Sequence, residues 1–176
     1  VAPFIKQGLV YLQHRGQESA GISTEEATVK NLGLVNTALP DKAISRLSGH
    51  FGIGHVRYST QGTTDILHSQ PFTANYNGQC ISIAHNGNIK NADIVRQELI
   101  DKNIQLETYS DTEVILKKLI YEIDKDLNNW TIQDITDVMI TNFPDSAWNI
   151  AILLPKKIIV LRDPSGYRPL SLCQSK

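Results

Sequence analysis

Two pairs of apolar segments are joined by connections of only two residues, and this feature constrains the fold of the chain most. The first pair flanks Glu25-Glu26, and the second flanks Pro155-Lys156. The segments are residues 20–24 with 27–35, and residues 149–154 with 157–161. A two-residue connection joins antiparallel strands, whereas parallel strands need a crossover of roughly a dozen residues or more. Both pairs are therefore predicted to be hairpins in antiparallel sheets.

Helical periodicity occupies much of the remaining chain. Apolar residues at Val1, Ile5 and Leu9 predict a helix that ends near Gly16. Further helices are predicted over residues 41–47, 91–101, 111–123 and 132–141, further strands over 51–57 and 80–84, and a polar loop over 61–71. The order helix, strands, helices, strands, with antiparallel pairing, predicts a single α+β domain.

Composition argues against nucleic-acid and membrane partners. The 176 residues carry a net charge of −1, and their basic residues form no long run. The apolar stretches are far shorter than the roughly 20 residues needed to cross a bilayer. The two cysteines, Cys80 and Cys173, are too few for a disulfide scaffold. We expect both to be small buried side chains in a protein of the reducing cytoplasm.

Arg57 is the first candidate for a binding residue. It follows an apolar strand and precedes hydroxyl residues. A guanidinium at a strand end can bind a carboxylate through two parallel hydrogen bonds. Thr60, three residues further on, could add a hydroxyl donor. The alternative is a surface arginine in an ordinary salt bridge.

Asn86-Gly87 and Asp111 are the other candidates. The amide of Asn86 and the backbone N–H of Gly87 could converge on one oxygen, as an oxyanion hole requires; the alternative is a plain hairpin turn. Asp111 begins a predicted helix and could bind an ammonium group; the alternative is an N-cap or a first-turn acid. Together with Arg57, these residues supply one complement for each polar group of an amino acid that carries a reactive side chain.

Six blocks of this sequence resemble the glutamine phosphoribosylpyrophosphate amidotransferases, and they occur in family order along nearly the whole chain. They are residues 12–22, 52–60, 70–72, 84–88, 110–113 and 162–170. The related glucosamine-phosphate synthase domains share the Asn-Gly pair and the Asp-Thr-Glu triplet. They usually carry different residues at His14 and Tyr58. The resemblance therefore favours the purine enzyme family.

The resemblance implies the fold and chemistry of a class II glutamine amidotransferase. The fold would be an N-terminal-nucleophile hydrolase, a four-layer αββα sandwich of two antiparallel sheets. An N-terminal cysteine would attack the glutamine amide, and its own α-amino group would act as the base. Arg57 with Thr60 would bind the substrate carboxylate, and Asp111 the ammonium. Asn86 and Gly87 would form the oxyanion hole, and Arg15 would support the surroundings of the nucleophile.

The sequence departs from this pattern at its beginning. Val1 stands about ten residues after the family's cysteine, as judged from the usual spacing to the block that contains His14. Neither Cys80 nor Cys173 matches that position. We therefore expect residues 1–176 to be an amidotransferase domain that lacks its extreme N-terminus and its phosphoribosyltransferase domain, and to be inactive as given.

The leading hypothesis is a glutaminase domain that feeds ammonia to phosphoribosylamine synthesis in the first step of purine biosynthesis. The alternatives are a catalytically dead module that binds glutamine and regulates a partner, and the amidotransferase half of another ammonia-transferring enzyme. The resemblance implies no cofactor or metal in this domain; Mg²⁺ would accompany only the phosphoribosyltransferase domain. It implies glutamine and that domain as partners, and a homo-oligomer for the full-length chain.

Overall fold

The first third of the chain, residues 1–58, forms a three-stranded antiparallel sheet with helices on one face. In chain order the elements are α1 (Ala2–Leu12), η1 (Gln13–Arg15), β1 (Ser19–Thr24), β2 (Thr28–Leu32), α2 (Val35–Ala38), α3 (Asp41–Ile44) and β3 (Gly52–Arg57). Strand β1 lies between β2 and β3, and all its residues are buried. Gly54 lets α1 pack directly on β3, because a Cβ there would lie 2.5 Å from Cγ2 of Ile5 and 3.1 Å from Cδ1 of Leu9.

Residues 65–174 form a four-stranded antiparallel sheet, in the order β4-β5-β6-β7, and a second helical layer. In chain order the elements are η2 (Ile66–His68), β4 (Phe72–Tyr76), β5 (Gln79–Asn88), α4 (Ala92–Asp101), α5 (Asp111–Glu122), η3 (Leu127–Asn129), α6 (Ile132–Asn142), β6 (Ala147–Leu154) and β7 (Lys157–Arg162). The largest apolar core joins the helices to the sheet, with Ile115, Leu119 and Trp130 packed in one cluster with Ile83 and Ile152. Burial of each such side chain contributes about 1.5–3 kcal/mol.

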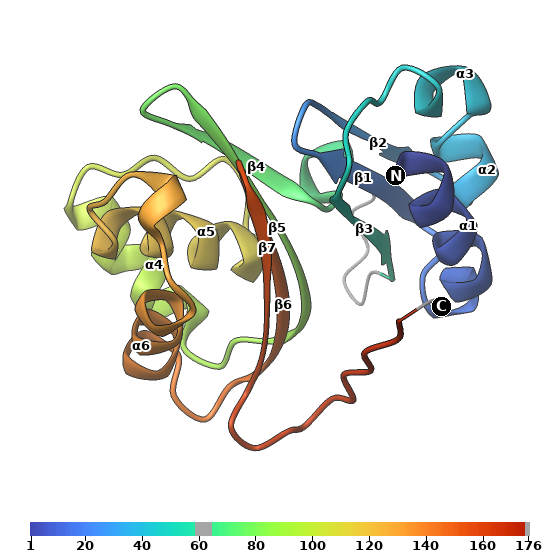
Figure 1. Ribbon diagram of the computed structural model, residues 1–176. Coiled ribbons are helices and arrows are strands. Elements are labelled where there is room, and N and C mark those ends of the chain that lie inside the picture. The colour runs from blue at the N-terminus through green and yellow to red at the C-terminus, as the bar shows by residue number, and fades with distance from the viewer. Residues whose placement is uncertain (59–64, 175–176) are drawn as a thin grey trace.

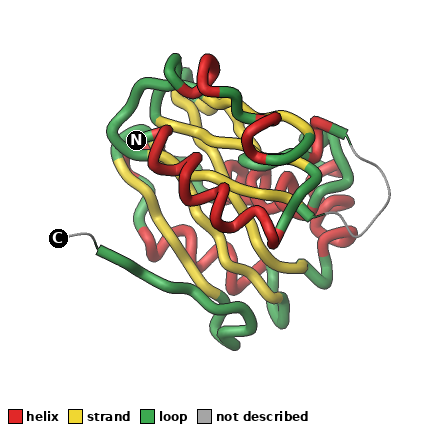
Figure 2. The backbone as a smooth tube through the Cα atoms, turned by 90° about the vertical axis from the view of Figure 1, so that its right-hand side faces the viewer, coloured by secondary structure: helices red, strands yellow, loops and turns green. Residues whose placement is uncertain are grey.

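The layers follow in the order helices, sheet, sheet, helices in this computed structural model, which describes residues 1–58 and 65–174. Figure 1 shows α1, α2 and α3 outside one sheet and α4, α5 and α6 outside the other. Figure 2 shows α1 crossing the outer face of the three-stranded sheet. The predicted four-layer αββα sandwich is therefore confirmed. Within the described ranges, no helix is long and apolar enough to cross a membrane.

The two sheets touch through a small apolar cluster that contains Ile53 of β3, Ala84 of β5 and Leu153 of β6. A polar contact adds to it, since the ammonium of Lys30 in β2 donates to the carbonyl oxygen of Ser69 at 2.7 Å. The apolar contact ends at Ile53 and Ala84. The residues that follow in these strands, 54–57 in β3 and 85–88 in β5, line the space between the sheets.

Most predicted elements are confirmed, and both two-residue connections join antiparallel strands: Ser23 pairs with Thr28, and Leu154 pairs with Lys157. The predicted strand over residues 27–35 is too long. It ends at Leu32 because Gly33 adopts φ +100°, and residue 35 begins α2. The helix predicted over 41–47 ends at residue 44.

The sequence analysis missed one strand and was wrong about the burial of both cysteines. Strand β4 was not predicted, although its side chains alternate between exposed and more buried along the strand. Cys80 and Cys173 are exposed free thiols, not buried side chains. Cys80 lies next to the turn at Asn77-Gly78, near the start of β5.

Helix α6 begins with a reciprocal capping box, which yields a test of local stability. The backbone N–H of Asp134 donates to Oγ1 of Thr131 at 3.1 Å, and the N–H of Thr131 donates to the Asp134 carboxylate at 2.9 Å. Thr131→Ala is expected to lower the free energy of unfolding by about 1 kcal/mol, measured by urea denaturation. Thr136→Ala, inside the same helix, is the matched control and should change it by less than about 0.5 kcal/mol. Equal losses in the two variants would contradict the capping role.

Candidate functional site

A cleft of about 1310 Å³ opens where the two sheets part. Its walls come from the ends of β3 and β5, the start of α5, the last turn of α1 and the C-terminal segment around residues 168–171. The predicted site residues that line it are Arg15, Arg57, Asn86, Gly87 and Asp111. Thr60, the remaining predicted residue, lies outside the described residues. Segments far apart in the sequence therefore meet in this one cleft.

Arg57 ends β3 and is held from one side by the segment before β1. Its guanidinium lies 3.4 Å from the carboxylate of Glu18, and the two side chains are 19% and 28% exposed. The backbone N–H of Glu18 donates to the Arg57 carbonyl at 3.1 Å. Gly16 packs against the same strand, since a Cβ on it would lie 2.6 Å from the carbonyl carbon of Arg57. The salt bridge considered as the alternative is thus present, and the partly buried Arg57 also lines the cleft.

Asn86 and Gly87 lie within a strand, so the alternative of a plain hairpin turn at this position is wrong. Strand β5 continues to residue 88, and Asn86 and Gly87 pair with Asn149 and Trp148 of β6. Only glycine fits at residue 87, because a Cβ would overlap the carbonyl oxygen of Ala147. Pairing with β6 fixes this backbone rigidly at the edge of the cleft.

Asp111 is the first residue of α5, and Ser110 caps the helix through a hydrogen bond from the backbone N–H of Thr112. The interpretation of Asp111 as a first-turn acid is therefore correct, and the N-cap alternative is wrong. The N–H of Ile89 donates to the Asp111 carboxylate at 3.3 Å, and Nδ1 of His85 lies 3.6 Å from it.

The environment of Asp111 keeps its carboxyl ionised. Burial raises the pKa of Asp111, but the hydrogen bond and charge of His85 and the N–H groups of Ile89 and Thr112 outweigh it. The pKa therefore lies below its ordinary value. The positive end of the α5 dipole acts in the same direction. A negative charge thus stands in the same cleft as the positive charge of Arg57.

Sequence reasoning assigned no role to the histidines and the glutamine that line the cleft, although all but His68 lie in the quoted blocks. They are His55, His68, His85 and Gln70. The side chain of Gln70 makes two hydrogen bonds with the backbone of His85, at 2.7 and 3.2 Å. Strand alternation could have identified His85. It follows Ile81 and Ile83 at alternate positions of one strand, so it faces the same buried side, and a buried polar side chain requires hydrogen-bond partners.

His55 yields a pH prediction. Burial, together with the charges of His85 and Arg57, lowers the pKa of His55 to about 4 from its ordinary 6.5. As the pH falls below 6.5 the unfolded chain takes up this proton while the folded protein does not, so stability falls between pH 6.5 and 4. We expect a loss of about 2–3 kcal/mol from this group, measured by urea denaturation across that range. His55→Gln should show a smaller loss; an unchanged pH dependence in that variant would contradict the assignment.

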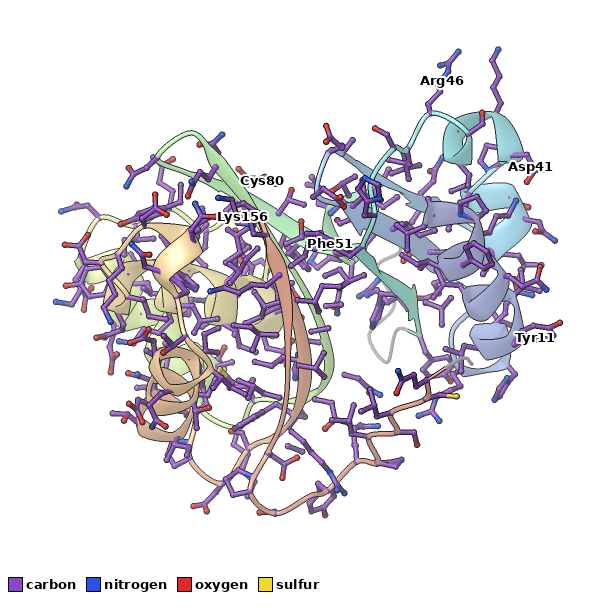
Figure 3. All side chains as sticks on the ribbon, viewed as in Figure 1. Tyr11, Asp41, Arg46, Phe51, Cys80 and Lys156 are labelled. Atoms are coloured by element: carbon purple, nitrogen blue, oxygen red, sulfur yellow. The ribbon has the colours of Figure 1, made fainter. Side chains whose placement is uncertain are left out.

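Neither cysteine belongs to the cleft. Cys80 and Cys173 are exposed and absent from its lining, and Figure 3 shows Cys80 near the β4–β5 end of the four-stranded sheet. The described residues include no cluster of three or more His, Cys, Asp or Glu side chains able to hold a metal ion. The cleft lining includes the charged side chains of Arg15, Arg57 and Asp111.

Comparison with known proteins agrees with this geometry. A family model described as "Glutamine amidotransferase domain" matches residues 55–176. The amidophosphoribosyltransferase of Methanothermobacter thermautotrophicus is 38% identical over 99% of this chain and 37% of its own length. That of Drosophila melanogaster is 35% identical over 98% of this chain and 33% of its own length. The chain thus spans about a third of the curated relatives it matches.

Solved structures give the same result. The glutamine phosphoribosylpyrophosphate amidotransferase of B. subtilis, complexed with ADP and GMP, superposes with a TM-score of 0.82 at 31% identity, over 96% of this chain and 36% of that one. A structure described as the allosteric regulatory enzyme of purine biosynthesis gives a TM-score of 0.84, also at 31% identity, over 96% and 36% of the two chains. The family match, these relatives and the αββα fold agree, and the chain belongs to the glutamine amidotransferase domain family, with the N-terminal-nucleophile hydrolase fold of the amidophosphoribosyltransferases.

Proposed function

We propose that this domain binds glutamine in the cleft and releases ammonia from its side-chain amide, as the glutaminase domain of an amidophosphoribosyltransferase. The observation that carries the proposal is the presence of Arg57, Asp111 and the Asn86-Gly87 pair in one cleft. An α-amino acid needs a cation for its carboxylate and an anion for its ammonium, and both are supplied here. A carboxylate without an amino group, or an amine without a carboxylate, would leave one of the two charges unpaired.

Each residue has a distinct role in this proposal. Arg57 binds the α-carboxylate, assisted by Thr60, and Asp111 binds the α-ammonium. The side-chain amide of Asn86 and the backbone N–H of Gly87 stabilise the oxyanion that forms when the amide carbon becomes tetrahedral. Arg15, which lines the same cleft, supports the surroundings of the nucleophile.

The nucleophile in this proposal is an N-terminal cysteine, as the family resemblance implies. Its thiolate adds to the amide carbon, its α-amino group carries the proton to the leaving nitrogen, and ammonia departs to leave a thioester. Water then hydrolyses the thioester to glutamate and regenerates the thiol. Cys80 and Cys173 are outside the cleft and have no α-amino group. Residues 1–176 alone would therefore bind glutamine without hydrolysing it.

The length of the relatives supports a proposal for the whole protein. Proteins named amidophosphoribosyltransferase are about three times as long as the matched region. We place a phosphoribosyltransferase domain in the same full-length chain, where it would take up the ammonia to make phosphoribosylamine in purine biosynthesis. Any Mg²⁺ would belong to that domain. A homo-oligomer in the cytoplasm completes the proposal, and the two exposed free thiols suit a reducing compartment.

Intact-mass measurement of the native gene product, before and after treatment with a glutamine-like electrophile, tests the glutaminase proposal. We expect a single adduct, located by peptide mapping on an N-terminal cysteine, and ammonia release that the adduct abolishes. Glutamine binding with no adduct and no ammonia would instead support the regulatory, catalytically dead module. Adduct formation on Cys80 or Cys173 would contradict the assignment of the nucleophile.

A further inference from the structure

The loop that precedes Asp111 has no regular secondary structure, and its last residue, Ser110, caps the helix that Asp111 begins. Residues 102–110 connect α4 to α5, and Tyr109 and Ser110 of this loop line the cleft. Tyr109 is 90% exposed. Such a loop needs specific contacts if the next residue is to stay fixed, because irregular segments otherwise have high conformational entropy.

Glu113, in the first turn of α5, holds the first part of this loop. Its side chain is buried, with the residue 4% exposed. It accepts hydrogen bonds from the N–H of Glu107 at 2.8 Å, and from the N–H and hydroxyl of Thr108 at 2.7 Å each. These bonds fix the loop to α5 as far as Thr108, whose hydroxyl also accepts a hydrogen bond from the N–H of Ser110 at 3.1 Å. None of these bonds involves Tyr109 or the carbonyl oxygens of Thr108 and Ser110.

Arg96 of α4 contacts residues 108–110 of the loop. Its guanidinium donates to the carbonyl oxygen of Thr108 at 2.7 Å and to that of Ser110 at 3.3 Å. The same guanidinium lies over the ring of Tyr109, 5.4 Å from its centre. One planar side chain thus binds three consecutive residues before Asp111, a task that suits the rigid fork of arginine. Arg96 itself does not line the cleft.

We propose that Arg96 is a positioning residue for the ammonium half of the amino-acid site, acting on Asp111 through the 108–110 segment. This inference rests on the proposed function, since it assigns the Asp111 carboxylate to the substrate ammonium. Arg57 lies at the end of β3 and is held by a different segment, near Glu18. Loss of Arg96 should therefore impair recognition of the ammonium group and leave recognition of the carboxylate unchanged.

Two ligands separate these halves: L-glutamine, and glutaramate, which is glutamine without its α-amino group. Calorimetric titration of Arg96→Met is expected to show about tenfold weaker glutamine binding, equivalent to about 1.4 kcal/mol, with glutaramate affinity changed less than about twofold. Methionine keeps the long side chain and favours helix but donates no hydrogen bond. Arg96→Lys keeps the positive charge and can still donate hydrogen bonds, but it lacks the planar fork. It should bind glutamine more tightly than Arg96→Met and less tightly than wild type.

Lys157→Met is the matched control. Lys157 also donates to two backbone carbonyls of a loop, those of Asn128 at 2.9 Å and Trp130 at 2.5 Å, but it is not part of the cleft. The Lys157→Met substitution should lower the melting temperature about as much as Arg96→Met and leave the affinities for glutamine and glutaramate unchanged.

The possible results separate the inference from the proposed function. If wild-type protein binds neither ligand, the proposed function fails and the inference fails with it. If wild-type protein binds both ligands and Arg96→Met weakens them equally, or weakens neither, only the inference is overturned. Should Arg96→Met fail to fold, the same comparison with Arg96→Lys decides: a loss confined to glutamine supports the inference, and unchanged or equal losses overturn it.

Discussion

Arg57→Ala is expected to abolish measurable glutamine binding, with a loss of more than about 100-fold in affinity. Truncating one partner of a buried, hydrogen-bonded charge pair typically costs about 2–5 kcal/mol, because the other charge is left unpaired. The change would leave two such charges, the ligand carboxylate and the Glu18 carboxylate that lies 3.4 Å from the guanidinium. Calorimetric titration with L-glutamine measures the effect.

Two variants make the Arg57 result specific. Arg57→Lys keeps the charge but loses the planar fork, so it should bind with intermediate affinity. Arg46→Ala removes an exposed arginine after α3, which does not line the cleft, and should bind like wild type; Figure 3 labels this residue. Normal affinity in Arg57→Ala, with the fold intact by circular dichroism, would rule out Arg57 as the carboxylate-binding residue.

Gly87→Ala is expected to have the largest effect on stability. The added Cβ would overlap the carbonyl oxygen of Ala147 and would lie 2.5 Å from Nε2 of His85. The first contact is with the backbone of the neighbouring strand, which cannot move without breaking the β5–β6 ladder. We expect the free energy of unfolding to fall by about 3 kcal/mol or more, measured by urea denaturation. The proposed oxyanion hole would be displaced as well, so ammonia release by the native protein should fall below detection.

The same substitution elsewhere provides the control. Gly8 lies in α1, and a Cβ there would meet nothing within 4 Å. Gly8→Ala should therefore stabilise the protein by about 0.5–1 kcal/mol, because alanine favours helix. If both glycine variants changed stability by the same amount, the close approach of β5 and β6 at Gly87 could not be the cause.

Local rules predicted much of the fold from the sequence. The connections at Glu25-Glu26 and Pro155-Lys156 predicted antiparallel hairpins, since two residues allow no other pairing. Strand β4 was not predicted, although its side chains alternate between more buried and exposed; its pairing with β5 decides its conformation. The strand predicted over residues 27–35 extends too far, because Gly33 with its positive φ turns the chain before Val35.

The site was predictable only as a set of residue types. Arg57, Asp111 and Asn86-Gly87 were recognised as complements of an amino acid, and the resemblance gave them roles, but their meeting in one cleft depends on tertiary packing. The Asn-Gly pair was weighed as a turn because that dipeptide favours turns in isolation. Pairing with Trp148 and Asn149 overrides this preference. Contacts made across the fold, such as those of Arg96 with residues 108 and 110, leave no signal at neighbouring positions in the sequence.

The central claim is that one cleft binds both the carboxylate and the ammonium of glutamine. Titration of isotope-labelled protein with L-glutamine, followed through backbone amide chemical shifts, tests this claim most directly. We predict saturable shifts that cluster at Arg57, Gly87 and Asp111, with glutaramate shifting the first two residues and leaving Asp111 unmoved. Absence of saturable shifts at these amides, or shifts confined to residues outside the cleft, would contradict it.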